Sequence, residues 1–201
     1  SENTYKSYQN ALRYFKDGSL EEIRAFLGKD LADSTKKQTL RILCVALEYN
    51  DMYDKARRKL IKSYRPNIAI QECPTDKDIE LVWGNLLTHR DRAMFALMAY
   101  NGLRVGEVAG LDMADLLKGN RLMLRNTKGK HDAIIPLVHP RVLSSLKAYI
   151  KERKGDSPAL FLNHRGARIS SNGLTQLIRN EFHDNGLDFH AHSLRRYFAN
   201  T

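Results

Sequence analysis

The sequence predicts a mainly α-helical protein with a small β-sheet, divided into two domains. Apolar residues recur at helical spacing through residues 1–65, and this spacing is lost over 66–74, where two prolines bracket a short strand-like stretch. Over 121–137 the apolar residues alternate on both sides of a basic turn, which is typical of a β-hairpin. We therefore expect a helical bundle over 1–65, a linker over 66–74, and a helical domain with a small sheet over 75–201.

Four helices are expected in the first domain. Tyr8 and Leu12 share one face of the first helix, which we expect to stop at Gly18 because glycine favours a C-terminal cap. Ser19 and Glu22 have the spacing of a capping box and begin the second helix. Two further helices are expected over residues 33–52 and 53–65.

In the second domain, helix boundaries are again marked by capping residues. Thr75 and Asp78 form another capping box, and the mostly apolar helix over 90–101 ends at Gly102, so we expect that helix to be buried. Three more helices are expected, one from Pro140 to Gly155, one over residues 170–186, and a final one from about Ala191.

The charge of the chain indicates a polyanionic partner. Its 201 residues include 33 Lys and Arg against 23 Asp and Glu, a net charge of +10. Residues 1–65 contain 14 basic and 9 acidic residues, and 66–201 contain 19 and 14, so each half carries +5. Both domains can therefore contact the same polyanion.

Several protein classes are excluded by composition. The longest apolar runs are too short to span a bilayer, and the N-terminal stretch has no signal-peptide pattern, so we expect a soluble protein without a membrane partner. The two cysteines, Cys44 and Cys73, suit a reducing compartment better than a disulfide framework, and they support no metal site.

Basic residues decorate the helices of the first domain. Those that we expect to bind DNA are Lys36, Lys37, Arg41, Arg57 and Arg58, with Lys59 and Lys62 nearby. An ordinary solvated face is the alternative interpretation of the same residues.

Three motifs of the second domain carry a resemblance when they are taken together. They are "RDRAMFALMAYNGLRVGEVAGL", "TKGKHDAIIPL" and "HSLRRYFANT", in this order. In order and separation they resemble the motifs of the tyrosine recombinases, the family of phage integrases and chromosome-dimer resolvases. The resemblance runs from Thr75 to the end, and the first domain is similar to the family's core-binding domain in kind only. It implies a helical core-binding bundle followed by an α+β catalytic domain that breaks and rejoins DNA at specific sites through a 3'-phosphotyrosyl intermediate.

The resemblance also implies a phosphate-binding site. Arg104 and Arg195 match the family's two arginines, whose planar guanidinium groups suit the charge that develops on a phosphate in the transition state. His192 precedes Arg195 by three residues, so both lie on one helical face and can reach one phosphate. Glu107 matches the family's acidic residue and is expected to orient the site.

A proton donor completes the implied chemistry. Lys128, eight residues before Pro136, matches the lysine expected to protonate the leaving oxygen, with Lys130 as the second choice. Arg196 stands where the family often has histidine, and we expect it to contact DNA. No metal or other cofactor is implied, because the bond energy is kept in the phosphotyrosyl linkage.

Each of these residues has a simpler interpretation by itself. Arg104 can be a surface cap and Lys128 a solvated turn residue. His190 and His192 form an H-x-H pair that can bind a metal, but no third ligand lies at a suggestive spacing. The joint occurrence of the motifs favours the phosphate-binding interpretation.

The attacking tyrosine is expected to be missing from this chain. The family's nucleophile lies a few tens of residues beyond H-x-x-R, and six residues follow Arg195 here. Tyr197 points ~200° around the helix from Arg195, and Tyr100 lies in an apolar run that predicts a core position. We therefore expect the chain by itself to be inactive in DNA cleavage.

Two other functions remain open. A non-catalytic DNA-binding module derived from the same fold is one, and a type IB topoisomerase is the other. For the recombinase we expect duplex DNA as partner, a dimer or tetramer on DNA, and a monomer in solution without the C-terminal segment. The expected location is the cytoplasm, in association with the nucleoid. The cell is expected to be a prokaryote or a host infected by a virus or plasmid.

Overall fold

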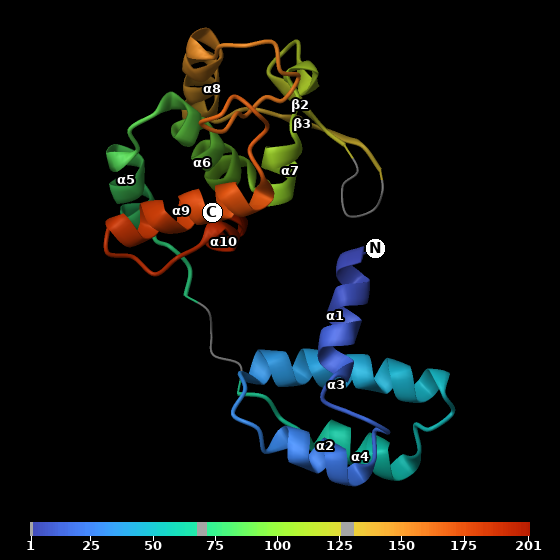
Figure 1. Ribbon diagram of the computed structural model, residues 1–201. Helices are drawn as coiled ribbons and strands as arrows, with labels where there is room; N and C mark the ends of the chain where they lie inside the picture. Colours follow the sequence, from blue (N-terminus) through green and yellow to red (C-terminus); the bar gives the residue numbers. More distant parts are fainter. Residues whose placement is uncertain (1, 68–71, 126–130) are drawn as a thin grey trace. The chain divides into compact units, whose positions relative to one another are not determined.

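The computed structural model describes residues 2–67, 72–125 and 131–201. It divides into two compact units, Ser1–Gln71 and Glu72–Thr201. Figure 1 shows each unit with its own set of packed helices. The sequence places the linker at 66–74, and the division between the units falls within that range.

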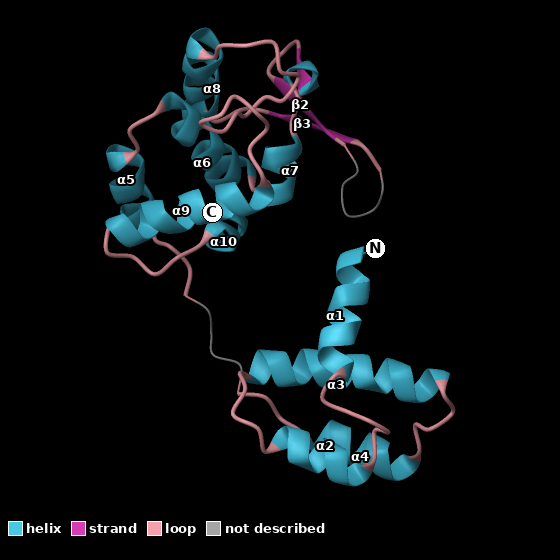
Figure 2. Cartoon of the chain, viewed as in Figure 1, coloured by secondary structure: helices cyan, strands magenta, loops and turns pink. Residues whose placement is uncertain are grey.

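Helices are the only regular secondary structure in the described residues of unit 1, and loops join them (Figure 2). Its helices are α1 (Glu2–Leu12), α2 (Leu20–Leu27), α3 (Asp33–Tyr49) and α4 (Lys55–Ser63). Its buried core consists of Ile23, Phe26, Leu40, Leu43 and Leu47. The rings of Tyr14 and Phe15 each lie 5.1 Å from the ring of Phe26, which places the chain between α1 and α2 against this core.

The first helix is shorter than the sequence predicts, because it ends at Leu12 rather than at Gly18. The carboxylate of Glu22, in the first turn of α2, accepts hydrogen bonds from the backbone N–H groups of Lys16, Asp17 and Gly18 at 3.0–3.2 Å. A charged acceptor at a helix N-terminus competes well for such donors. It therefore bends residues 16–18 into a turn instead of a continued helix.

Unit 2 combines helices with the predicted small sheet. Its elements are α5 (Asp76–Asn85), α6 (His89–Asn101), α7 (Val105–Gly110), a 3-10 turn (Met113–Asp115), β1 (Leu116–Leu117), β2 (Arg121–Leu124), β3 (Ala133–Pro136), α8 (Pro140–Glu152), α9 (Ser171–Asp184) and α10 (Ala191–Asn200). The sheet is antiparallel in the order β1-β2-β3, and Leu122 pairs with Ile135. The hairpin prediction is therefore confirmed for its two strands.

The core of unit 2 is built around α6. Every residue of this helix from Ala93 to Ala99 is buried. The helix packs against both α8 and α10, so it is apolar on more than one side. It ends as predicted at Gly102, which has the left-handed φ of +64° that glycine adopts without a steric penalty.

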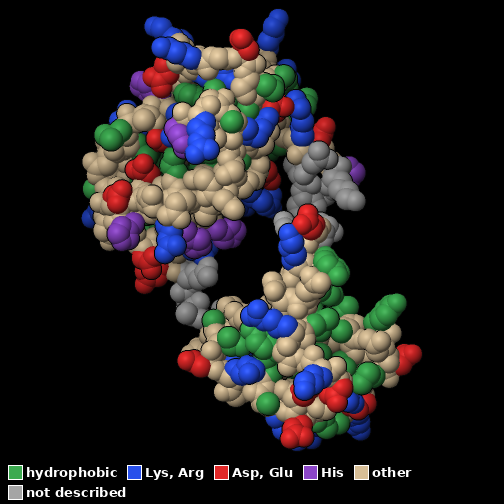
Figure 3. All heavy atoms as spheres, viewed as in Figure 1, with side chains coloured by type: hydrophobic (Ala, Val, Ile, Leu, Met, Phe, Trp, Pro, Cys, Tyr) green, Lys and Arg blue, Asp and Glu red, His purple; other side chains and the backbone are tan. Residues whose placement is uncertain are grey.

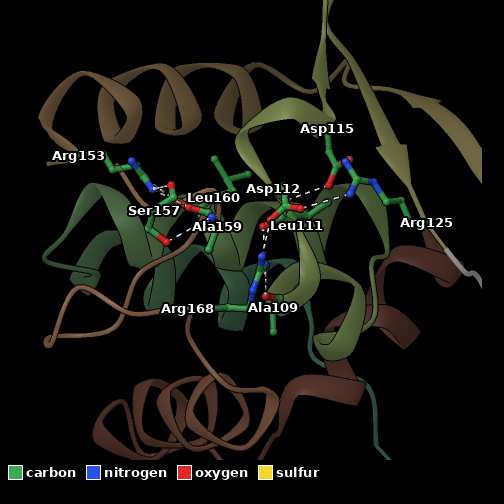
Figure 4. Close-up of polar contacts among 10 residues, drawn as sticks. All are labelled: Ala109, Leu111, Asp112, Asp115, Arg125, Arg153, Ser157, Ala159, Leu160 and Arg168. Atoms are coloured by element: carbon green, nitrogen blue, oxygen red, sulfur yellow. Dashed lines mark hydrogen bonds and ion pairs between the residues drawn. The ribbon is translucent and has the colours of Figure 1, made fainter. Parts of the chain in front are cut away.

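One arginine fixes the loop that follows α8. The guanidinium of Arg153 donates hydrogen bonds to four backbone carbonyl groups, those of Gly155, Ser157, Ala159 and Leu160. Figure 4 shows three of these acceptors gathered around the single side chain. The loop therefore satisfies its carbonyl groups without forming regular secondary structure.

A second polar network closes the end of α7 (Figure 4). Arg168 donates to the carbonyl groups of Ala109 and Leu111 and pairs with Asp112. Asp112 also pairs with Arg125, which follows β2, at 3.3 Å. One carboxylate thus connects α7, β2 and the chain before α9.

Candidate active site

Arg104 is the N-cap residue of α7 and is bound by Glu107. The Glu107 carboxylate accepts from the Arg104 backbone N–H at 2.8 Å and from Arg104 Nη1 at 2.7 Å. The Glu107 side chain is 14% exposed and that of Arg104 is 44% exposed. Glu107 therefore fixes one edge of the guanidinium group, while the rest of the Arg104 side chain remains accessible to a ligand.

Arg195 is bound to the same stretch of chain. Its Nη1 donates a hydrogen bond to the carbonyl of Gly102, two residues before Arg104. Gly102 has no side chain between this carbonyl and α10, and the ring of Phe198 lies directly over it. The structure thus brings the two arginines, 91 positions apart in the sequence, to one part of unit 2.

His192 is exposed and lies one helical turn before Arg195 on α10. His190 has a different role, because its Nδ1 lies 3.0 Å from Ser193 Oγ in the cap of α10. Burial, assisted by nearby Arg196 and His192, lowers the pKa of His190. Across the described ranges, no three His, Cys, Asp or Glu side chains are grouped as a metal site.

Lys128 and Lys130 lie outside the described residues. The strands on either side of them are described, and β3 contacts the segment that precedes Arg104. Asn101 Nδ2 donates to the carbonyl of Pro136 at the end of β3, at 3.0 Å. This contact fixes the end of β3 that lies farther from the two lysines, and β2 is connected to it through its pairing with β3.

The contacts of Asp112, Arg125 and Arg168 were missed by sequence reasoning. Arg125 also pairs with the buried carboxylate of Asp115 at 2.6 Å. Asp115 in turn accepts from the Asp112 backbone N–H at 2.8 Å. Two aspartates three residues apart after a helix form the pattern of a local cap, and that pattern was the available signal.

Arg196 and Tyr197 point toward the beginning of unit 2. Arg196 Nη2 donates to the carbonyl of Glu72 at 3.2 Å and to Ser193 Oγ at 3.0 Å. The Tyr197 hydroxyl donates to Asp76 Oδ1 at 2.8 Å, and burial together with this carboxylate raises the pKa of Tyr197. The DNA contact expected of Arg196 stays a prediction.

The other two tyrosines of unit 2 are also engaged. The ring of Tyr100 stacks on His139 with centroids 3.8 Å apart, and its hydroxyl accepts from Arg141 Nη1 at 2.6 Å. Tyr149 is buried, and its hydroxyl accepts from the Leu162 backbone N–H at 3.2 Å. Each hydroxyl is thus part of the internal structure of the unit.

Two of the basic residues predicted to bind DNA have partners inside unit 1. Lys36 Nζ donates to the carbonyl of Leu27 at 2.9 Å. Arg57 donates to the carbonyl of Gly18 at 2.8 Å and pairs with Asp54 at 2.6 Å. Their DNA-binding role stays a prediction, although part of their hydrogen-bonding capacity is used internally.

The other three are more exposed. Lys37 and Arg41 line a groove of about 440 Å³ between α3 and α4, together with Lys62 and Arg65. The Arg58 guanidinium lies 5.2 Å from the centre of the Tyr53 ring. Figure 3 shows Lys and Arg side chains spread over the visible face of each unit rather than gathered in one patch.

Comparison with known proteins gives consistent matches. The phage integrase family model matches residues 75–201. The tyrosine recombinase XerC of Actinobacillus pleuropneumoniae is 27% identical over 99% of this chain and 74% of its own length. XerA of Pyrococcus horikoshii is 26% identical over 99% of this chain and 73% of its length.

Solved structures show the same fold at low sequence identity. A crystal structure of XerA recombinase has a TM-score of 0.60 at 19% identity, covering 99% of this chain and 77% of that one. A lambda integrase tetramer bound to a Holliday junction has a TM-score of 0.77 at 16% identity, covering 100% of this chain and 67% of that one. Within the described residues, no helix is long and apolar enough to cross a membrane.

Proposed function

The chain belongs to the phage integrase family and is a tyrosine recombinase, and on this premise we propose how its residues divide the work of breaking and rejoining DNA. Arg104 and Arg195 bind the scissile phosphate. The observation that carries this proposal is the contact of Arg195 with the Gly102 carbonyl, two residues before Arg104. In this proposal, the guanidinium groups of Arg104 and Arg195 bind the same scissile phosphate, on which negative charge develops in the transition state.

Glu107 and His192 complete the phosphate site in this proposal. Glu107 orients Arg104 through its backbone N–H and its guanidinium, so that Arg104 needs little rearrangement when a phosphate binds. His192 is exposed on the turn that precedes Arg195, from which its imidazole reaches the same phosphate. Lys128 supplies the proton to the leaving oxygen, with Lys130 as the second candidate.

The attacking tyrosine is none of the three in unit 2. Tyr100, Tyr149 and Tyr197 have their hydroxyl groups bound to Arg141, to a backbone N–H and to Asp76. A raised pKa also makes Tyr197 a poorer nucleophile, since its phenolate forms less readily. Unit 2 should therefore bind DNA without forming a covalent link to it through any of these three tyrosines.

Duplex DNA is the proposed partner of both units. Each half of the chain carries a net charge of +5, and in unit 1 the exposed Lys37, Arg41 and Arg58 are the leading contacts, with Lys36 and Arg57 as secondary ones. We further propose assembly into a dimer or tetramer on DNA from a monomer in solution, and a cytoplasmic location beside the chromosome.

Binding to duplex DNA is tested by titration at two salt concentrations. We expect affinity to fall steeply with salt, because bound counterions are released from the phosphates. Arg104→Ala and Arg195→Ala should each weaken binding, whereas Lys147→Ala, on an exposed part of α8, should not. Binding that is absent or insensitive to salt would contradict the proposal.

Cleavage is tested with a nicked suicide substrate and a denaturing gel. The chain of residues 1–201 should give no covalent adduct. A chain in which a tyrosine-bearing segment of a similar recombinase is fused after Thr201 should give one, and Arg195→Ala should abolish it. An adduct formed by residues 1–201 would show that one of the internal tyrosines attacks.

A non-catalytic DNA-binding module is the second candidate, favoured by the engagement of all three tyrosines of unit 2. It predicts that the fusion binds DNA yet forms no adduct. A type IB topoisomerase predicts instead that the fusion relaxes supercoiled plasmid.

A further inference from the structure

The end of the linker that leaves unit 1 is bound back onto α3. Asp33, the first residue of α3, accepts from the Tyr64 hydroxyl through Oδ1 and from the Asn67 backbone N–H through Oδ2, both at 2.6 Å. These hydrogen bonds lower the pKa of the Asp33 carboxyl. The chain after α4 therefore stays attached to unit 1 as far as Asn67.

The end that enters unit 2 is bound by α10. Arg196 donates to the carbonyl of Glu72, and Tyr197 donates to the carboxylate of Asp76, four residues later. Arg196 is also the position at which the chain departs from the histidine common in the family. Its longer side chain thus has an internal use, the attachment of the first residues of unit 2.

These two attachments shorten the chain that connects the units. Four residues, 68–71, separate Asn67 from Glu72, and five extended steps span at most about 18 Å. Without the attachments, the nearest anchored residues are Tyr64 at the end of α4 and Thr75 at the start of α5. Eleven steps would then connect them and span at most about 40 Å.

We propose that Asp33 and Arg196 are positioning residues that set the length of chain through which the two units bind one duplex. The proposal rests on the proposed function, since it needs both units to contact DNA. A longer connection lowers the effective concentration of the second unit after the first has bound, roughly as the −3/2 power of its length. Loss of one attachment leaves seven connecting residues and lowers DNA affinity about twofold, and loss of both leaves ten and lowers it about fourfold.

The attachments are tested first without DNA. In Arg196→Ala, the protease Glu-C should cut after Glu72 about fivefold faster, because one hydrogen bond no longer opposes local opening. In Asp33→Ala, the Asn67 amide should exchange its hydrogen faster by a similar factor. Arg179→Ala removes an exposed arginine from α9 and should change neither rate. Unchanged rates in the first two variants would overturn the assignment.

Measurements of affinity for duplex DNA then separate the effect of linker length from the effect of charge. Asp33→Ala removes a negative charge, which alone would tighten binding to DNA, whereas loss of the attachment should weaken binding about twofold. Inserting three Gly or Ser residues between Asn67 and Glu72 leaves both attachments in place and should weaken binding by the same factor.

The two proposals fail in different ways. Tighter or unchanged binding by Asp33→Ala, or no effect of the insertion, would overturn the role in DNA binding. If the unmodified chain binds no DNA, the proposed function fails, while the cleavage and exchange rates still decide whether the attachments exist.

Discussion

Gly102→Ala should destabilise unit 2 by about 2–4 kcal/mol. The φ of +64° costs a residue with a Cβ about 1–2 kcal/mol. The added Cβ would also lie 2.3 Å from Cδ1 of Phe198, which must move away. Because Phe198 is 44% exposed, its displacement loses only part of the 1.5–3 kcal/mol that full burial provides, about 1–2 kcal/mol.

Denaturant unfolding followed by tryptophan fluorescence measures this cost. Trp83 is the only tryptophan in the chain, and its ring packs within 6.4 Å of Phe95 and 6.3 Å of Tyr100 in unit 2. Its emission therefore reports on unit 2 rather than unit 1. DNA affinity should fall as well, because a displaced α10 moves Arg195 away from the Gly102 carbonyl.

Two further variants separate the causes. Gly102→Ala combined with Phe198→Ala removes the clash but keeps the backbone strain. Phe198→Ala should therefore lower the free energy of unfolding less in the Gly102→Ala background than in the wild type. Gly84→Ala, within α5 and with no atom within 4 Å of the new Cβ, should stabilise the unit by up to about 1 kcal/mol. Wild-type stability of Gly102→Ala would refute the reasoning.

Three other outcomes are expected. Unit 2 should lose stability as the pH falls below 6.5, because burial lowers the pKa of His139 and His190 and the unfolded chain then binds more protons than the folded one. His139→Asn preserves a capping side chain and should reduce this pH dependence. Unfolding measured from pH 7 to 5 tests both statements. Asp112→Ala should lower the free energy of unfolding by about 1–3 kcal/mol, because the partly exposed Arg125 and Arg168 lose their shared carboxylate. A decrease below about 0.5 kcal/mol would show that these ion pairs contribute little to stability. Arg41→Ala should reduce the salt dependence of DNA binding at unchanged stability, whereas Arg57→Ala should lower the thermal stability of unit 1; the reverse pattern would contradict the assignment of their contacts.

Helix boundaries that depend on local signals could be predicted from the sequence. Thr75 and Asp78 form the predicted capping box, and Gly102 ends α6 as predicted. The end of α1 could not be predicted in this way. It depends on whether the Glu22 carboxylate accepts from the backbone N–H of the cap residue Ser19 or, as observed, from the backbone N–H groups of residues 16–18. Both arrangements satisfy the same pattern, and tertiary packing selects between them.

The candidate site shows a similar limit. The family resemblance pointed to Arg104 and Arg195, but the hydrogen bond from Arg195 to the Gly102 carbonyl, two residues before Arg104, depends on how α10 packs against α6. The internal partners of Lys36 and Arg57 are carbonyl groups 9 and 39 positions away in the sequence, and no local pattern marks them. A basic residue therefore cannot be assigned to solvent, DNA or the interior from charge alone.

The attachment of the 155–160 loop to Arg153 affects how this region can vary. One side chain satisfies four backbone carbonyl groups of the loop, and the buried Ala159 and Leu160 hold its end against the core. Substitutions of the exposed Asp156 and Pro158 that keep the backbone should therefore be tolerated. Lysine at 153 would place a single ammonium where a planar fork now spans four acceptors, and it could not replace the arginine. The hydrogen bonds that hold the loop thus come from a position just outside it, and engineered changes of surface or length there should leave Arg153 unchanged.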